Sequence, residues 1–431
     1  MIDTWPLWRR ILFRFFFIYF TLTILPWWLS IIPGIAFPAE QYTTALGWLA
    51  MKMNDWIYHL PRHPIPVQNN GSGDTSGNWA TTFTVLLIAV SGAVIWSFLQ
   101  RRKKEYSVLN YWLCLNVRYF IVMVSFVYGI IKLFGMQMSF PTYSQLATPL
   151  GDFLPMRFSW LFIGYSAPYQ FFSGLMEVVA GVLLLYRRTI TLGAIVAAGV
   201  FLNIAVLNLS YDIPVKIFSI EMVVSCLFLL ANEKDRILCF FVYNRPAPSC
   251  SLYNHFPVRQ RWHRVSRIVL KTAFILLSAG GVVYQSYTWQ KESGAGRNNM
   301  PFEPGIYDVI TYAVNTDTLP PLFTDSIRWQ NVVFDNSSYG SIATSDTIFR
   351  RRYGRGYFSY KADTLKQTVD IFRNSGDSIA LARLRYQLLD KNTITFQGIH
   401  RKDSIFFVLR KNPHYYQLTE KQFHWISEAN R

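Results

Sequence analysis

Seven apolar segments constrain the fold of this chain more than any other feature. Each is close to the roughly 20 residues that an α-helix needs to cross a hydrocarbon core of about 30 Å. Inside lipid only helices and closed barrels satisfy every backbone hydrogen bond, so these segments predict seven transmembrane helices. The first follows Arg9 and Arg10, but it is too long for a signal peptide and we interpret it as an anchor. The segments cover residues 11–32, 79–99, 113–134, 165–185, 190–207, 213–230 and 268–287.

Composition supports a membrane protein made of two unlike parts. Hydrophobic residues make up 51% of the chain and charged residues 16%, against about a quarter charged in a soluble domain. The mean hydropathy of +0.18 is low for a pure membrane bundle. The first 301 residues hold 25 Lys and Arg against 12 Asp and Glu, whereas the remainder holds 17 against 13. Because the excess positive charge sits in the apolar part, it disfavours a nucleic-acid partner and points to membrane topology.

The distribution of Lys and Arg predicts the orientation. With a cytoplasmic N-terminus, the outer loops before residue 300 carry only Lys52, Arg62, Arg157, Lys291 and Arg297. The tail beyond residue 287 is then outside, so we expect a bacterial inner-membrane protein with a periplasmic C-terminal domain. The inner segments hold many more cations, namely Arg9, Arg10, Arg101, Arg102, Lys103, Lys104, Arg187, Arg188, Lys234, Arg236, Arg245, Arg259, Arg261 and Arg264.

The sequence divides into four regions. Residues 1–112 hold two transmembrane helices and an outer loop, in which 45–58 predicts an interfacial helix and the Gly/Ser/Asn stretch 69–77 a flexible linker. Residues 113–231 form a four-helix core. Residues 232–290 hold a basic cytoplasmic loop and the seventh helix, and 302–431 form an exported β domain.

The β domain shows the period-two alternation of antiparallel strands. Alternating apolar residues occur around 327–332, 394–398 and 405–409, with turn signals at 335–338, 374–377, 390–392, 401–403 and 411–413. We count eight or nine short strands, with a helical pattern only at 420–429. This predicts a small lipocalin-like barrel, with a sandwich as the alternative.

Ionisable and amide side chains inside the spans are the candidate site, because charge in lipid is costly and faces a cavity or a partner. Glu177 and Glu221 lie near mid-depth and are candidates for proton transfer, and Lys132 is a third catalytic candidate. The alternative is that these residues only pair to hold helices together, with Lys132 opposite Glu177 or Glu221 and Asp212 opposite Lys216. Lys216 also has a suitable depth to pair with Glu177. Arg118 lies nearer the inner end and is either an anchor or a ligand. The residues placed in the outer half, which we expect to converge on one pocket, are Lys132, Glu177, Asn203, Asp212, Lys216 and Glu221.

Metal and haem sites are not predicted. His59 and His63 have the spacing of a metal pair, but Pro61 lies between them. No histidine lies within a predicted span, which disfavours a b-type haem.

The core resembles the DoxX-like four-helix membrane family. The resemblance covers residues 118–230 and rests on Arg118 early in the first core helix, a Gly-x-x-Lys ending at Lys132, and a Glu-x-x-x-Gly beginning at Glu177. Residues 211–216, ending at Lys216, complete the pattern. The β domain looks like the extension on DoxX-like proteins of Bacteroidetes-type bacteria. Family members include small subunits of quinone-linked oxidoreductases and helpers for maturing exported redox enzymes.

Two hypotheses follow, and they differ in whether the protein takes part in a reaction. In the first, it is redox-associated and binds a quinone or similar lipophile in the outer half of the bundle. Lys132 orients an oxygen, Glu177 relays a proton, and the aromatic segment 158–172 lines the entry. A membrane or periplasmic redox protein would be its partner. In the second, the helices only anchor it in the bilayer and the β domain binds an envelope partner. A transporter is disfavoured, because no inverted repeat is evident.

Overall fold

The computed structural model of the protein consists of two compact units. The helical unit comprises Met1–Gln137 and Pro168–Ser286, and the barrel unit comprises Met138–Ala167 and Tyr287–Arg431. Each unit has its own hydrophobic core. The residues that the structure describes are 4–31, 36–60, 73–248, 260–297, 301–322, 325–346, 353–400, 402–413 and 416–420.

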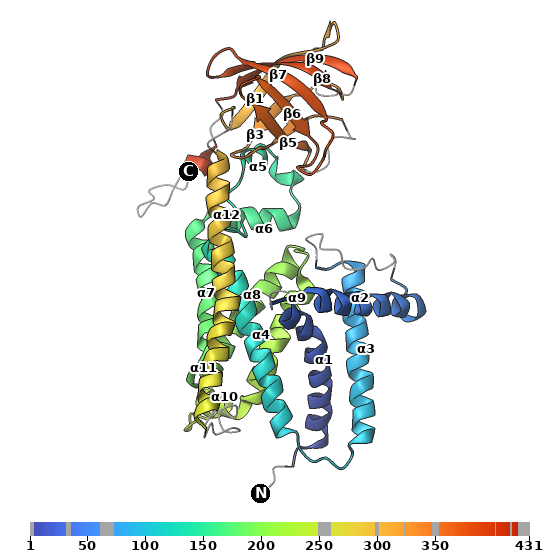
Figure 1. The fold of residues 1–431 in the computed structure, drawn as a ribbon, viewed down its shortest axis with the longest axis vertical. Coiled ribbons are helices and arrows are strands. Elements are labelled where there is room, and N and C mark those ends of the chain that lie inside the picture. Colours follow the sequence, from blue (N-terminus) through green and yellow to red (C-terminus); the bar gives the residue numbers. More distant parts are fainter. Residues whose placement is uncertain are drawn as a thin grey trace. The chain divides into compact units, whose positions relative to one another are not determined.

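Long apolar helices build the helical unit (Figure 1). The last of them runs through a π-helical turn, Leu276–Gly280, into α12. Short π- and 3-10-helical turns, Asn54–Tyr58 and Arg187–Thr189, follow α2 and α7. The α-helices are α1 (Leu7–Ile31), α2 (Ala36–Met53), α3 (Ser76–Leu99), α4 (Ser107–Leu133), α7 (Ala167–Leu185), α8 (Ile190–Ser210), α9 (Lys216–Asn232), α10 (Lys234–Phe241), α11 (Arg261–Ile275) and α12 (Gly281–Arg297).

Each of the seven predicted spans corresponds to a helix. Six spans among the described residues are long and apolar enough to cross a membrane. The exception is α9, which at 17 residues is the shortest of the seven. The central helix is α4. In its apolar 18-residue stretch 67% of the residues are buried, against 22% in the corresponding stretches of α1 and α3.

Two segments predicted to be irregular are partly ordered, and one predicted helix has different bounds. The predicted linker was wrong for residues 73–77: the Gly73 amide donates to the Pro214 carbonyl at 2.7 Å, and Thr75 caps α3. Residues 69–72 lie outside the described part. The helix predicted at 45–58 begins earlier, at the start of α2, and the basic loop after residue 232 contains α10 and the start of α11.

The segment between α4 and α7 belongs to the barrel unit. It contains α5 (Tyr143–Leu146), a 3-10 turn at Leu150–Asp152, and α6 (Pro155–Tyr165). Gly135 ends α4 with a φ of +67°, a conformation that glycine adopts without strain. The predicted aromatic segment 158–172 is thus divided between α6 and the first turn of α7.

Eight strands close into an antiparallel barrel, which confirms the predicted closed meander over the sandwich (Figure 1). Consecutive strands pair, and β1 pairs with β9 to close the sheet. The two-residue β2 (Asp317–Thr318) extends one end of β1, and α13 (Gln417–Glu420) follows the barrel. The closing strands are β1 (Gly305–Val314), β3 (Asn331–Phe334), β4 (Tyr339–Ala343), β5 (Arg355–Asp363), β6 (Thr368–Phe372), β7 (Ala382–Leu388), β8 (Thr393–His400) and β9 (Asp403–Lys411).

Most turn signals of the β domain were correct, but one strand prediction was not. The turns at 335–338, 374–377 and 390–392 separate consecutive strands. Residues 327–330, in contrast, precede β3. Asp325 accepts hydrogen bonds from the amides of Ile327 and Arg328, and such a turn competes with a strand ladder. The buried Arg328 guanidinium also donates to the carbonyls of Leu319 and Val309. Of the helix predicted at 420–429, residues 421–429 lie outside the described part.

Candidate functional site

A buried ion pair joins two helices of the helical unit. Lys132, in the last turn of α4, donates a hydrogen bond from Nζ to Oε1 of Glu177, which lies in the middle of α7. The two side chains are 7% and 0% exposed. The sequence offered Lys132 and Lys216 as partners for Glu177, and the structure selects Lys132.

Two glycines allow the helices to approach closely at this pair. Gly129 and Gly174 each lie three residues before a member of the pair, on α4 and α7. A Cβ added to Gly174 would lie 2.6 Å from the Gly129 carbonyl oxygen and 2.8 Å from Lys132 Cβ. One added to Gly129 would lie 2.9 Å from the Gly174 carbonyl oxygen. Small residues at such crossings are typical of membrane helix pairs.

The pair retains one unused acceptor. Oε2 of Glu177 is buried and has no hydrogen-bond partner. Tyr128, one turn before Lys132, lies close enough to Glu177 to interact with it electrostatically. A buried polar atom without a partner calls for an explanation, and a ligand hydroxyl or a transferred proton would satisfy this one.

A second charged group lies at the N-terminus of α9. Lys216 Nζ contacts Asp212 at 2.6 Å and Asp74 at 3.7 Å rather than Glu177. Asp74 also accepts hydrogen bonds from the backbone amides of Lys216 and Ile217, so it caps α9. Sequence analysis did not single out Asp74, because it lies in the stretch interpreted as a linker.

The other sequence candidates lie apart from the Lys132–Glu177 pair. Glu221, on α9, interacts with Thr23 and Tyr19 of α1, and its Oε1 is buried without a hydrogen-bond partner. Asn203 is exposed on α8. Arg118 is buried on α4, with its guanidinium 5.0 Å from the Tyr119 ring. The structure therefore brings together Lys132 and Glu177 in one place and Asp212 and Lys216 in another.

Sequence analysis also missed a buried arginine. Arg14, within α1, is 2% exposed and donates to the Tyr106 hydroxyl, Ser97 and the Gln100 carbonyl. These acceptors complete its hydrogen bonding without a carboxylate, so Arg14 ties α1 to α3 and to the start of α4. The sequence signal that could have identified Arg14 was a single cationic residue within an apolar span.

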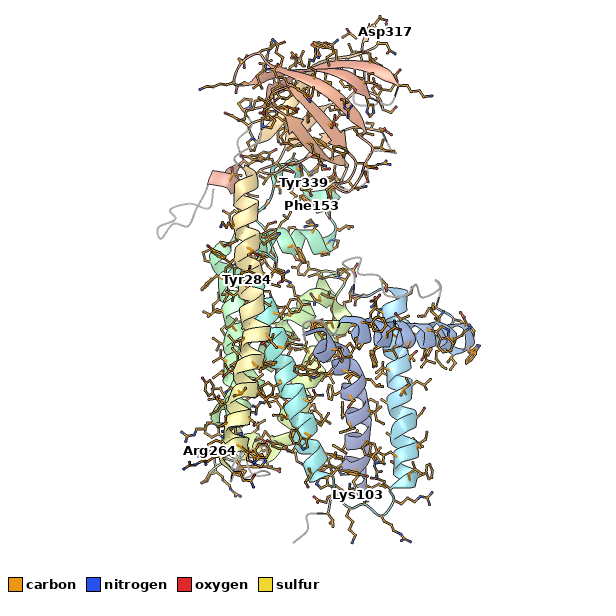
Figure 2. The ribbon with its side chains drawn as sticks, in the orientation of Figure 1. Lys103, Phe153, Arg264, Tyr284, Asp317 and Tyr339 are labelled. Carbon is orange, nitrogen blue, oxygen red and sulfur yellow. The ribbon has the colours of Figure 1, made fainter. Side chains whose placement is uncertain are left out.

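A polar cluster fixes the 138–167 segment within the barrel unit. Asp335, at the end of β3, accepts from the Ser144 amide at 2.9 Å and from its hydroxyl at 2.8 Å. Ser341 donates to the Ser144 hydroxyl oxygen at 2.9 Å, and Arg355 donates to Ser341 at 2.7 Å. Burial raises the pKa of Asp335, although the bonds from Ser144 oppose the shift. Burial also lowers the pKa of Arg355 to about 10. The ring of Phe153, which is labelled in Figure 2, lies 5.3 Å from the ring of Tyr353 in the barrel unit.

The barrel interior is filled by side chains. The cavity at its centre has a volume of about 10 Å³, which is room for about one water molecule. Its lining is apolar and includes Trp329, Phe334, Phe358, Phe396 and Phe407. The barrel is thus closed, and this cavity is too small for a lipophilic ligand.

No group of three or more potential metal ligands occurs in the described part of the chain. His63, one of the two histidines with metal-like spacing, lies outside that part.

Comparison with known proteins gives one similarity and two negative results. The chain is 35% identical over 124 residues to the uncharacterized protein YwoB of Bacillus subtilis (strain 168). These residues make up 29% of this chain and 79% of YwoB. No family model matches the chain. No solved structure matches it either.

Proposed function

The chain belongs to the family of the uncharacterized Bacillus subtilis protein YwoB, and on that premise we propose a function from its own residues. We propose an integral membrane protein of DoxX-like type whose Lys132–Glu177 pair is the polar centre of a binding site for a quinone-like lipophile. The observation that carries the proposal is Oε2 of Glu177, a buried acceptor without a partner beside a buried cation.

The chemistry of a quinone suits this pair. A quinone presents carbonyl oxygens, which the Lys132 ammonium can orient by donating a hydrogen bond. Reduction to the quinol consumes two electrons and two protons. A redox protein would supply the electrons, and Glu177 would relay the protons, because a carboxyl in a low-dielectric setting can exist in either protonation state.

Lipid extraction from the purified full-length protein tests this proposal. The wild type should release a quinone detectable by mass spectrometry, and Glu177→Gln and Lys132→Ala should each retain much less of it. Glu221→Gln is the matched control, since Glu221 is a second intramembrane carboxyl with a neutral partner, Thr23. Absence of any redox lipophile from the wild type, or equal retention by all variants, would refute the proposal.

We further propose that seven helices cross a bacterial inner membrane. Lys103 and Arg264 lie at the same end of the helical unit in Figure 2, as expected if that end is cytoplasmic. The Ser144–Asp335 bonds require the loop between α4 and α7 to share a side of the membrane with the barrel. Between that loop and the barrel lie α7, α8, α9 and the α11–α12 helix. An even number of crossings is needed, so α9 must cross as well, and 17 residues lies at the lower limit for a span.

A second candidate function is a membrane-anchored binding protein that acts through the barrel. The filled interior and the fixed 138–167 segment favour it, because they make the barrel a rigid presentation surface. Complementation of a deletion strain separates the two candidates. If Glu177→Gln and Lys132→Ala both complement while substitutions of exposed barrel residues such as Leu365 do not, the binding function is favoured over the redox one.

A further inference from the structure

A cluster of cationic side chains lies toward one end of the helical unit. The Lys132–Glu177 pair lies toward the other end. Arg118 of α4 interacts electrostatically with Lys271 of α11 and with Arg187, which follows α7. Lys271 in turn interacts with Arg267, one turn earlier on α11. Arg118, Lys271 and Arg267 carry the same sign, so their proximity is unfavourable unless an anion lies near them.

The position of Lys271 sets the depth of the cluster. Its Nζ donates to the carbonyl of Leu185, the last residue of α7, at 2.9 Å and lies 4.4 Å from the centre of the Tyr186 ring. Arg187 and Arg188 follow directly. The cluster is therefore level with the end of a membrane-spanning helix, which is the depth of lipid headgroups.

An unsatisfied hydrogen-bond donor on Arg118 also points to a bound anion. Its side chain is 6% exposed, and its Nε is buried without a hydrogen-bond partner. No carboxylate forms an ion pair with Arg118, Arg267 or Lys271 in the described part of the chain. Arg14, the other buried arginine of the helical unit, has its donors satisfied by neutral groups. Arg118 thus retains an unused N–H in a buried, positively charged setting.

We infer that Arg118, Lys271, Arg187 and Arg267 form a binding site for the phosphodiester group of an anionic phospholipid. A guanidinium and an ammonium are the usual protein donors to phosphate oxygens, and basic pockets between membrane helices bind anionic headgroups. A phosphate oxygen would accept from Arg118 Nε and offset the repulsion with Lys271. The inference is independent of the proposed quinone site.

Binding of phosphatidylglycerol to the full-length protein in neutral detergent micelles tests the inference, with native mass spectrometry as the readout. The wild type should retain phosphatidylglycerol in preference to phosphatidylcholine, and Arg118→Gln should bind it about tenfold more weakly. Lys271→Gln is a second variant in case Arg118→Gln does not fold, and Arg118→Lys should restore part of the binding. Arg102→Gln, at an exposed cation in the loop before α4, should bind like the wild type.

Thermal unfolding distinguishes the lipid from a free anion. Phosphatidylglycerol should raise the Tm of the wild type and not that of Arg118→Gln, whereas inorganic phosphate should raise neither. An equal Tm rise with inorganic phosphate would overturn the assignment to a lipid. Equal retention of phosphatidylglycerol by Arg118→Gln, Lys271→Gln and Arg102→Gln would overturn the site itself.

Discussion

At the scale of residues, the ion pair between Lys132 and Glu177 has the clearest energetic consequence. Lys132→Ala leaves a fully buried carboxylate without its cation, and we expect it to destabilise the protein by about 3–5 kcal/mol. In a Glu177→Gln background the same change should cost much less, because no buried charge is left behind. Thermal unfolding of the wild type, the two single variants and the double variant in one detergent completes this double-mutant cycle. Additive effects would show that the two side chains do not interact.

Asp335 predicts a pH dependence for the barrel unit. Burial raises its pKa above the ordinary value of 3.8, so the folded chain holds this proton at a pH where the unfolded chain has released it. The stabilising contribution of protonated Asp335 is therefore lost as the pH rises from 3.8 through the pKa of the folded state, and it is absent at higher pH. In near-ultraviolet circular dichroism melts from about pH 4 to 7, the wild type should lose stability relative to Asp335→Asn. A constant difference between the two would contradict the burial assignment.

The sequence predicted some of these contacts and not others, for physical reasons. Depth within a span follows from counting residues, so Lys132 and Lys216 could both be offered as partners for Glu177 before the structure was known. The bonds of Asp335 to Ser144 and of Asp74 to the start of α9 join residues far apart in the chain. In the sequence these carboxylates look like ordinary turn residues, because nothing local records their partners.

At the scale of elements, the crossing of α4 and α7 depends on glycine. Gly174→Ala would place a methyl group 2.6 Å from the Gly129 carbonyl oxygen, so the helices must separate, at a cost of about 1–3 kcal/mol. Gly199→Ala on α8 is the control, since a Cβ there meets nothing within 4 Å. That change should be neutral or stabilising by up to about 1 kcal/mol. Equal Tm values for the two variants would argue against a tight crossing.

Elements with strong periodicity were predictable, and those fixed by tertiary contacts were not. Long apolar runs identified the membrane helices, and period-two alternation between turn residues identified β8 and β9. The segment 327–329 alternates equally well but is held off the ladder by Asp325 and by the buried Arg328. The short helices α5 and α6 lie between two predicted spans and have no clear helical pattern of their own, so they were not anticipated.

At the scale of the whole molecule, the proposed number of crossings rests on chain connectivity and hydrogen bonding together. Hydropathy alone gives six spans in the described part, which would leave the barrel and the α4–α7 loop on opposite sides of the membrane. The Ser144–Asp335 bonds favour the same side for both, and in the proposed topology the short α9 supplies the additional crossing. The charge distribution independently predicts that this side lies outside the cell.

Labelling of single cysteines with a membrane-impermeant thiol reagent tests this central claim most directly. In a background with the four native cysteines replaced by serine, we would compare Ser210→Cys and Asp235→Cys, which flank α9, with Leu365→Cys in the barrel and Lys103→Cys. Intact cells should label positions 210 and 365, whereas positions 103 and 235 should react only after permeabilisation. Labelling of 210 and 235 from the same side would contradict the crossing by α9, and protection of 365 in intact cells would contradict the exported barrel.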